Sequence, residues 1–227
     1  VSDEPLRIEL PSGPWEPRNH DGRFRGTVDL REAVRTSLNL PFVRVSRWCD
    51  ADAVAARMRR AGLDLPDAPP PSFALGAVET TPLELAGAYT DFASPGKAAR
   101  PLGIRRVEKP AGGRMDRFRP DRRTVVRASA AYLIRDLLTD AVENGTGRRA
   151  AIDGVAVAGK TGSTRDAWFV GEAGGIVTVA WVGLDQGDLG LGGGRTAAPL
   201  WRSFMKHATA ARAPRPVERP ADVVVRR

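Results

Sequence analysis

Residues 155–163 read Val-Ala-Val-Ala-Gly-Lys-Thr-Gly-Ser, so a single lysine follows a short apolar run. The run predicts a short buried strand, in which Gly159 would let another backbone come close. The hydroxyls of Thr161 and Ser163 flank the ammonium of Lys160 and could hold a carboxylate together with it. The alternative interpretation is a solvated strand end followed by ordinary turn residues.

The same stretch also matches the string of a phosphate-binding loop, because Gly154 stands five residues before Gly159-Lys160-Thr161. Such a loop needs a flexible glycine-rich turn after a strand, and a helix after the lysine. Here residues 155–158 are themselves strand-like, a turn follows the lysine, and residues 166–183 predict further strands. The context therefore argues against a nucleotide site at Lys160.

The amino-acid composition excludes several kinds of functional site. The chain has 227 residues, of which 42% are hydrophobic, enough for the core of one large domain. Only four of its 35 basic residues are lysine, so Lys160 stands out in an arginine-dominated chain. Cys49 is the one cysteine and there are two histidines, which excludes an internal disulfide, a cysteine-based metal site and a histidine-rich metal centre. We expect no metal and no cofactor.

The order of predicted elements favours an α+β architecture over alternating β-α-β units. Residues 1–26 predict extended, irregular structure, and residues 94–124 interrupt the periodicity with Gly, Pro and Arg. Helices are predicted at 51–61 after the N-cap Asp50, at 82–92 after a Thr81–Glu84 capping box, at 128–142, and at 197–208 after Thr196. Strands are predicted at 155–159, 167–171 and 176–183, the last two joined by a hairpin turn. We predict that Cys49, on a helical segment, is buried and packs as a small apolar residue.

Ser37-Leu38-Asn39 is a second candidate for chemistry. Taken alone, Ser37 and Asn39 could simply be polar residues at a helix end that satisfy backbone groups. Together with Lys-Thr-Gly downstream, they match two of the three motifs that recur in penicillin-binding proteins and class A β-lactamases, S-x-N and K-T-G.

The chain resembles the transpeptidase domain of a bifunctional, class A penicillin-binding protein over about residues 10–205. The resemblance rests on these strings, in family order: WEPRN (15–19), GTVDLREA (26–33), SLN (37–39), ALG (74–76), TPLELA (81–86) with Ala88-Tyr89, GTGR (145–148), GKTGS (159–163), DAWFVG (166–171), WVG (181–183) and PLW (199–201). It implies a β-lactamase/transpeptidase-like α+β fold, with an antiparallel sheet flanked by helices. It also implies that residues 1–210 form part of such a domain. Residues 211–227 hold three prolines and five arginines, and this composition predicts a Pro/Arg-rich, disordered tail.

One family motif is missing. The nucleophilic serine and its lysine partner, S-x-x-K, should precede Ser37, and no such string does. The two later matches are interpreted as coincidences: 94–97 contains Pro and Gly, and 203–206 lies in the predicted last helix, out of family order. We therefore expect a fold that is incomplete at its N-terminus and an isolated chain that is inactive.

The resemblance implies a serine acyl-enzyme mechanism that cross-links peptidoglycan, with stem peptides and β-lactams as ligands. By analogy Ser37 relays a proton, Asn39 holds the substrate amide and orients the catalytic lysine, and Lys160 supplies positive potential. Thr161 and Ser163 bind the substrate carboxylate, Gly162 belongs to the same motif, and the Ser163 N–H forms half of an oxyanion hole. The parent protein would act at the extracytoplasmic face of the bacterial membrane, and would touch the membrane only through an absent N-terminal anchor.

Two alternatives stay open. The chain could be a non-catalytic relic or a peptidoglycan-binding module. It could also bind nucleic acid, because residues 100–127 hold ten basic and three acidic residues, a net charge of +7 out of the chain's +8. No helix-turn-helix, zinc or aromatic stacking pattern accompanies that charge, so nucleic acid is not the expected partner; an anionic wall polymer, lipid headgroups or plain solvation explain the charge equally well.

Overall fold

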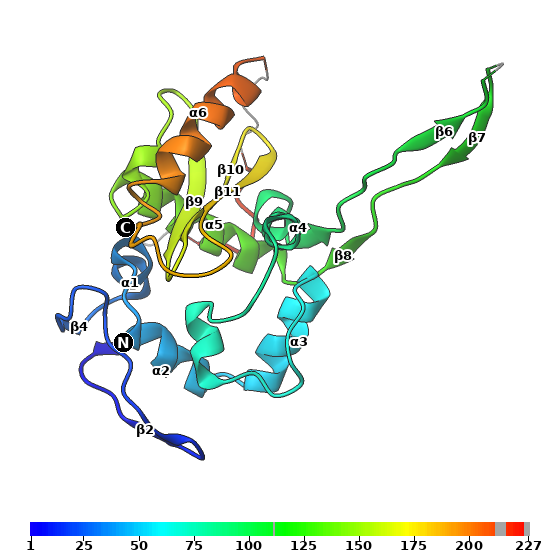
Figure 1. Cartoon of the computed structure of the whole chain (residues 1–227). Coiled ribbons are helices and arrows are strands. Elements are labelled where there is room, and N and C mark those ends of the chain that lie inside the picture. The colour runs from blue at the N-terminus through cyan, green and yellow to red at the C-terminus, as the bar shows by residue number, and fades with distance from the viewer. Residues whose placement is uncertain (111, 212–216, 225–227) are drawn as a thin grey trace.

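The computed structural model of the chain describes residues 1–110, 112–211 and 217–224. At its centre lies an antiparallel sheet of three strands in the order β11-β10-β9 (Figure 1). The strands are β9 (Val157–Ser163), β10 (Ala167–Ala173) and β11 (Ile176–Val182), and Val170 of β10 pairs with Lys160 on one side and Val179 on the other. Helices flank this sheet, so the predicted α+β class is confirmed.

Strand β9 is longer than the sequence suggested. The prediction ended the apolar run at residue 159, with Lys160 at the strand end and a turn after it, and that turn is wrong. Strand β10 continues the pairing as far as Ala167 opposite Ser163, so all four residues belong to the strand. No helix follows Lys160 in this part of the structure, which agrees with the argument against a phosphate-binding loop.

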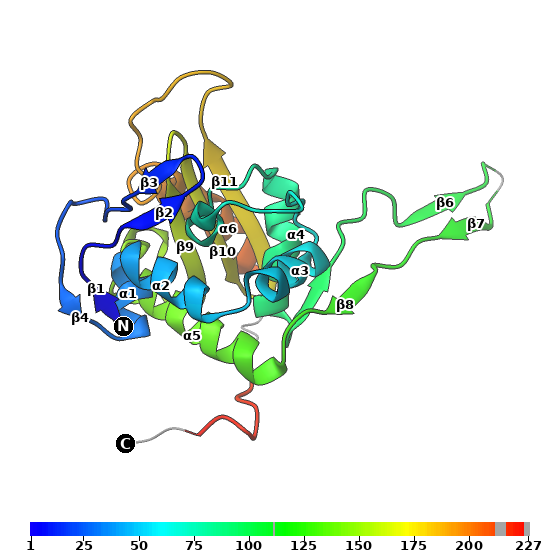
Figure 2. The ribbon, with the colours of Figure 1, turned by 90° about the horizontal axis from the view of Figure 1, so that it is seen from below.

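Helix α6 (Ala197–Ala210) covers one face of the sheet (Figures 1 and 2). Its Trp201 packs against Phe169 of β10 with ring centroids 5.1 Å apart and the ring planes tilted by 59°, and both side chains are buried. A Cβ at position 159 would lie 2.6 Å from the Phe169 ring, so Gly159 makes room chiefly for an aromatic ring. The expectation that it admits another backbone was therefore incomplete. Thr196 is the N-cap residue, but its side chain makes no capping bond.

Helix α5 (Ala128–Glu143) packs against the opposite face, since Glu172 and Phe169 point to opposite sides of β10. Arg135 of α5 donates from Nε and Nη2 to Oε2 of Glu172, at 3.1 and 2.8 Å. The N–H of Gly175 donates to the other carboxylate oxygen, so the ion pair also holds the β10–β11 turn. Both charged side chains are nearly buried, with 13% and 6% exposure.

Four further helices precede α5. They are α1 (Leu30–Thr36), α2 (Leu40–Trp48), α3 (Ala51–Ala61) and α4 (Pro82–Ala93), with a 3-10 turn η1 (Pro71–Leu75) between the last two. The predicted caps are confirmed: Asp50 accepts two N–H groups at the start of α3, and Thr81 and Glu84 form a reciprocal capping box. Cys49 is exposed at the end of α2, so the prediction that it is buried is wrong.

The N-terminal segment is more ordered than its composition suggests. Strand β1 (Ser2–Asp3) pairs with β4 (Gly26–Thr27), and β2 (Ile8–Leu10) pairs with β3 (Gly13–Trp15). These ladders are two or three residues long, too short for a periodic hydrophobic pattern to show.

Residues 94–124, where no regular element was predicted, form two strand pairs that follow one another along the segment. Strand β5 (Lys97–Ala99) pairs with β8 (Arg122–Thr124), and beyond them β6 (Arg106–Glu108) pairs with β7 (Arg114–Arg117). The outer pair projects far from the rest of the molecule (Figures 1 and 2). None of its described side chains is buried, which explains why hydrophobic alternation did not reveal it.

Two remaining expectations concern the ends of the chain and the membrane. Of the tail proposed for 211–227, residues 212–216 and 225–227 lie outside the described part. Among the helices that the structure describes, none combines the length and the apolar character that a bilayer crossing requires.

We predict that Glu172→Ala lowers the free energy of unfolding by about 3–5 kcal/mol, because it leaves a nearly buried guanidinium without its carboxylate. Urea denaturation followed by circular dichroism measures the change. The control is Asp121→Ala, which breaks the half-exposed Arg123–Asp121 pair and should cost about 0–1 kcal/mol. Equal losses for the two variants would contradict the structural role given to Glu172.

Candidate functional site

Ser37 occupies a strained backbone position. It caps the C-terminus of α1 with φ 58° and ψ 48°, the left-handed region, and its N–H bonds to the carbonyl of Val34. Among the residues that the structure describes, it is the one non-glycine residue with positive φ. This conformation costs about 1–2 kcal/mol in an L-residue with a Cβ. The observation that a serine bears this strain suggests that its hydroxyl is used.

The hydroxyl of Ser37 meets the ammonium of Lys160. Nζ of Lys160 donates to Ser37 Oγ at 2.8 Å and to the carbonyl of Thr161 at 3.1 Å, and lies 3.5 Å from Thr161 Oγ1. Strand β9 is at the edge of its sheet, so no further strand of the described structure pairs with its outer side. The fold thus brings together two predicted site residues that are 123 positions apart.

Burial changes the acidity of this ammonium. Desolvation lowers the pKa of Lys160 to about 8. The hydrogen-bond partners that the described part of the chain offers Nζ are neutral oxygens. The group is therefore a partly dehydrated cation below pH 8 whose charge lacks a counterion, and a ligand carboxylate would complement it.

Asn39 is held beside this pair by the N-terminal segment. Its Nδ2 donates to the carbonyl of Arg18 at 2.7 Å, and its own N–H donates to Oδ1 of Asn19 at 2.8 Å. Within the described residues, no hydrogen bond joins its side chain to Ser37 or Lys160. Asn39 thus lies two residues after Ser37, but its hydrogen bonds attach it to the N-terminal segment.

Asn19 is a residue whose role sequence reasoning missed. It is 5% exposed, and its Nδ2 lies 2.8 and 2.9 Å from the two carboxylate oxygens of the fully buried Asp3. The same nitrogen donates to the carbonyl of Arg23. This network ties residues 2–27 to the start of α2, just after Ser37. The 15–19 string contained Asn19, but nothing in it indicated a buried partner.

Thr146 is a second residue whose role at the site was not predicted from the sequence. Its hydroxyl lies 2.9 Å from that of Thr161, and its N–H donates to the carbonyl of Arg35 in α1. A Cβ on Gly145 would lie 2.2 Å from that same carbonyl, so a glycine is needed for the close approach. The Gly-Thr-Gly string at 145–147 was the available signal.

Ser163 and Gly162 contact a glycine-rich loop rather than the lysine. The N–H of Gly193 donates to Ser163 Oγ at 2.9 Å. A Cβ on Gly193 would lie 2.4 Å from the Gly162 carbonyl, so only glycine fits at this position. Of the two predicted hydroxyls, the structure brings Thr161 to the ammonium and gives Ser163 a backbone partner.

The two downstream S-x-x-K strings form no comparable pair. Ser94 is the extended cap residue after α4, and Lys97 is exposed on β5. Ser203 and Lys206 are both exposed on α6, and no hydrogen bond connects them in the described structure.

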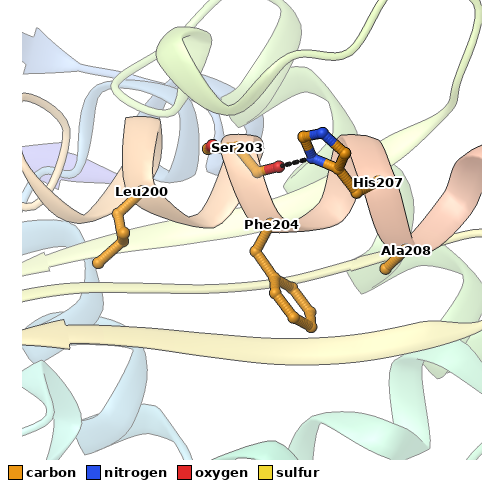
Figure 3. Close-up of a pocket in the computed structure, with 5 residues that line it drawn as sticks. All are labelled: Leu200, Ser203, Phe204, His207 and Ala208. Atoms are coloured by element: carbon orange, nitrogen blue, oxygen red, sulfur yellow. Dashed lines mark hydrogen bonds between the residues drawn. The ribbon is translucent and has the colours of Figure 1, made fainter.

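A shallow hollow also lies on α6. It has a volume of about 590 Å³ and is lined by Leu200, Ser203, Phe204, His207 and Ala208. His207 there bonds the backbone carbonyl of Ser203, not its hydroxyl (Figure 3). The hollow contains none of the residues around Lys160, so it is not the candidate site.

Known proteins are similar to this chain in sequence and in fold. The family profile of the penicillin binding protein transpeptidase domain matches residues 3–206. Penicillin-binding protein 1A of Aquifex aeolicus is 37% identical over 86% of this chain and 28% of its own length. Penicillin-binding protein 1B of Vibrio cholerae is 34% identical over 91% of this chain and 28% of its own. The chain thus spans less than a third of these curated relatives.

Solved structures of penicillin-binding proteins also superpose on this chain. The crystal structure of penicillin-binding protein 1A from Haemophilus influenzae superposes with a TM-score of 0.88 at 25% identity, covering 99% of this chain and 41% of that one. The imipenem acyl-enzyme of penicillin-binding protein A from M. tuberculosis gives a TM-score of 0.74 at 26% identity, covering 92% and 56%.

We predict that Ser37→Ala lowers the pKa of Lys160 further below about 8, because it removes an acceptor that favours the charged ammonium. Carbon-13 NMR of labelled lysine measures this pKa, since the chain has only four lysines and Lys160→Met assigns the signal. Ser203→Ala, on α6, should leave the titration unchanged. An unaltered Lys160 pKa in Ser37→Ala would show that the Ser37 contact is absent in solution.

Proposed function

Because this chain belongs to the penicillin-binding protein transpeptidase family, we propose that it forms the ligand-binding part of a D,D-transpeptidase that cross-links peptidoglycan through a serine acyl-enzyme. The observation that carries the proposal is the 2.8 Å contact between Lys160 Nζ and Ser37 Oγ. It joins the S-x-N and K-T-G segments at the open edge of β9.

The ammonium of Lys160 and the hydroxyl of Thr161 are proposed to bind the terminal carboxylate of a stem peptide or the carboxylate of a β-lactam. Both groups lie together at the sheet edge, and the ammonium has no carboxylate of its own. A charge-assisted hydrogen bond in a partly dehydrated site is stronger than a neutral one. The extended backbone of β9 would accept the ligand by strand-type pairing at the same edge.

Ser37 is proposed to relay a proton. Its hydroxyl accepts a hydrogen bond from Lys160, which leaves its own O–H free to point at a reacting group. A lysine whose pKa is about 8 can both hold and release that proton near neutral pH. Asn39 would present its amide to the substrate peptide, and the Ser163 N–H would stabilise an oxyanion.

We propose that this chain does not itself supply the nucleophile of the mechanism. No S-x-x-K string precedes Ser37, and neither downstream string forms a paired site. We therefore propose that the chain binds its ligands reversibly, and that in the longer protein a separate segment provides the acylated serine. The proposed setting is the extracytoplasmic face of a bacterial membrane. A non-catalytic peptidoglycan-binding module is the alternative that the missing motif favours.

We expect the isolated chain to bind benzylpenicillin weakly and without a covalent adduct. Lys160→Met should reduce affinity at least tenfold, because a charge-assisted hydrogen bond is lost. Thr161→Val should reduce it less. Binding should fade as pH rises through about 8 in the free chain, because only protonated Lys160 attracts the carboxylate. NMR titration gives the affinities, and intact-mass spectrometry detects any adduct.

Lys97→Met is the matched control, since Lys97 is an exposed lysine on β5. It should bind like the wild type. An acyl adduct on Ser37, Ser94 or Ser203 would overturn the proposal that the nucleophile lies elsewhere. Equal affinity for Lys160→Met and wild type would overturn the assignment of the carboxylate site.

A further inference from the structure

The turn that follows α5 holds Thr146 in a fixed position beside the site. The Thr146 N–H donates to the carbonyl of Arg35, two residues before Ser37, at 3.1 Å. A Cβ on Gly194 would lie 2.7 Å from the Thr146 carbonyl, so the loop that precedes α6 packs closely against the same residue. Backbone contacts with two other segments therefore fix Thr146, and its side chain is not needed for this placement.

The Thr146 side chain makes one hydrogen bond in the described structure. Its hydroxyl lies 2.9 Å from the hydroxyl of Thr161. Thr146 is exposed, so water could serve its hydroxyl equally well, and folding gains little from the bond. Its branched Cβ limits rotation about χ1, so the hydroxyl is held in few directions. An exposed hydroxyl that is held against a residue of the candidate site suggests a role in that site.

The two hydroxyls can share their protons in two ways. Each hydroxyl has one proton to donate and can accept two hydrogen bonds. Either Thr146 donates to Thr161, which leaves the Thr161 proton free, or Thr161 donates to Thr146 and has no proton left. Nζ of Lys160 lies 3.5 Å from Thr161 Oγ1, and a charged ammonium only donates, so it does not compete for the Thr161 proton. Without a ligand, both arrangements are allowed.

A carboxylate ligand selects between the two arrangements. An ionised carboxylate accepts hydrogen bonds and donates none. The proposed carboxylate site consists of Lys160 and Thr161, so a ligand bound there needs the Thr161 proton. Thr161 can donate this proton only when Thr146 supplies the proton of the hydroxyl pair. In such a chain each hydrogen bond polarises the next, which strengthens the bond to the ligand.

We propose that Thr146 is a positioning residue of the carboxylate site: its hydroxyl donates to Thr161 Oγ1 and thereby directs the Thr161 proton to the ligand carboxylate beside Lys160. Thr146 acts through Thr161 and does not itself touch the ligand. This inference rests on the proposed function, because it concerns the same ligand carboxylate. It adds to the site a residue from the turn after α5, outside the S-x-N and K-T-G segments.

A double-mutant cycle at positions 146 and 161 tests the inference, with the 227-residue chain, benzylpenicillin and affinities from NMR titration. Thr146→Val removes the hydroxyl but keeps the branched side chain and the N–H bond to Arg35. It should lower the affinity about two- to tenfold, the range for the loss of one hydrogen bond. Thr146→Ser should keep most of the wild-type affinity, because serine retains the hydroxyl. In the Thr161→Val background, Thr146→Val should cause no further loss, because the residue through which Thr146 acts has lost its hydroxyl.

Thr124→Val is the matched control, since Thr124 is an exposed threonine on β8, and it should bind like the wild type. Equal affinity of Thr146→Val and wild type, with Lys160→Met still weakened, would overturn this inference and leave the proposed function standing. Equal losses from Thr146→Val in the wild-type and Thr161→Val backgrounds would also overturn it, because Thr146 would then act independently of Thr161.

Two further outcomes are decisive. Lost binding in both Thr146→Val and Thr146→Ser, together with lower melting temperatures by circular dichroism, would give the side chain a structural role and overturn the inference. If Lys160→Met binds like the wild type, the carboxylate site itself is wrong, and the inference falls with the proposed function.

Discussion

The hydrogen bond from Lys160 to Ser37 is the contact on which the site depends. It closes a loop of more than half the chain, and each partner is held at a cost. Lys160 is partly dehydrated, so its charged form is disfavoured, and Ser37 sits in a backbone region that favours glycine. Hydrophobic packing does not offset the desolvation of Lys160 or the backbone strain at Ser37, because the groups that meet are polar. The surrounding elements must therefore impose the geometry, and the structure shows how they do so.

Three separate segments hold α1 and β9 in place. Thr146 bridges them, with its N–H on the Arg35 carbonyl and its hydroxyl on Thr161. On the far side of the sheet, the contact between the Phe169 and Trp201 rings and the closely packed Gly159 hold β9 against α6 through β10. On the near side, Arg135 and Glu172 connect α5 to the β10–β11 turn. The site is thus assembled on rigid elements, with one loop, around Gly193, reaching the end of the strand.

Much of this could be predicted from the sequence, because the relevant signals are local. The caps at Asp50 and Thr81, the helix of α5 and the β10–β11 hairpin follow from short-range patterns. The S-x-N and K-T-G strings identified Ser37 and Lys160 before their contact was known. What escaped prediction depends on partners distant in sequence. The extension of β9 needs β10, the burial of Asn19 needs Asp3, and the described residues of the β6–β7 hairpin include no buried side chain to leave a pattern.

At position 37, the residue that would best stabilise the left-handed backbone differs from the residue that supplies the hydroxyl for Lys160. Glycine would relieve the strain and make the end of α1 easier to form, yet it would leave Lys160 without its hydroxyl partner. Asparagine tolerates the same backbone angles, but it places an amide where a hydroxyl is needed. Variants selected only for thermal stability should therefore drift toward glycine at this position, whereas variants selected for ligand binding should keep serine. The residue found at position 37 in a selected variant would therefore show whether stability or ligand binding was the property under selection.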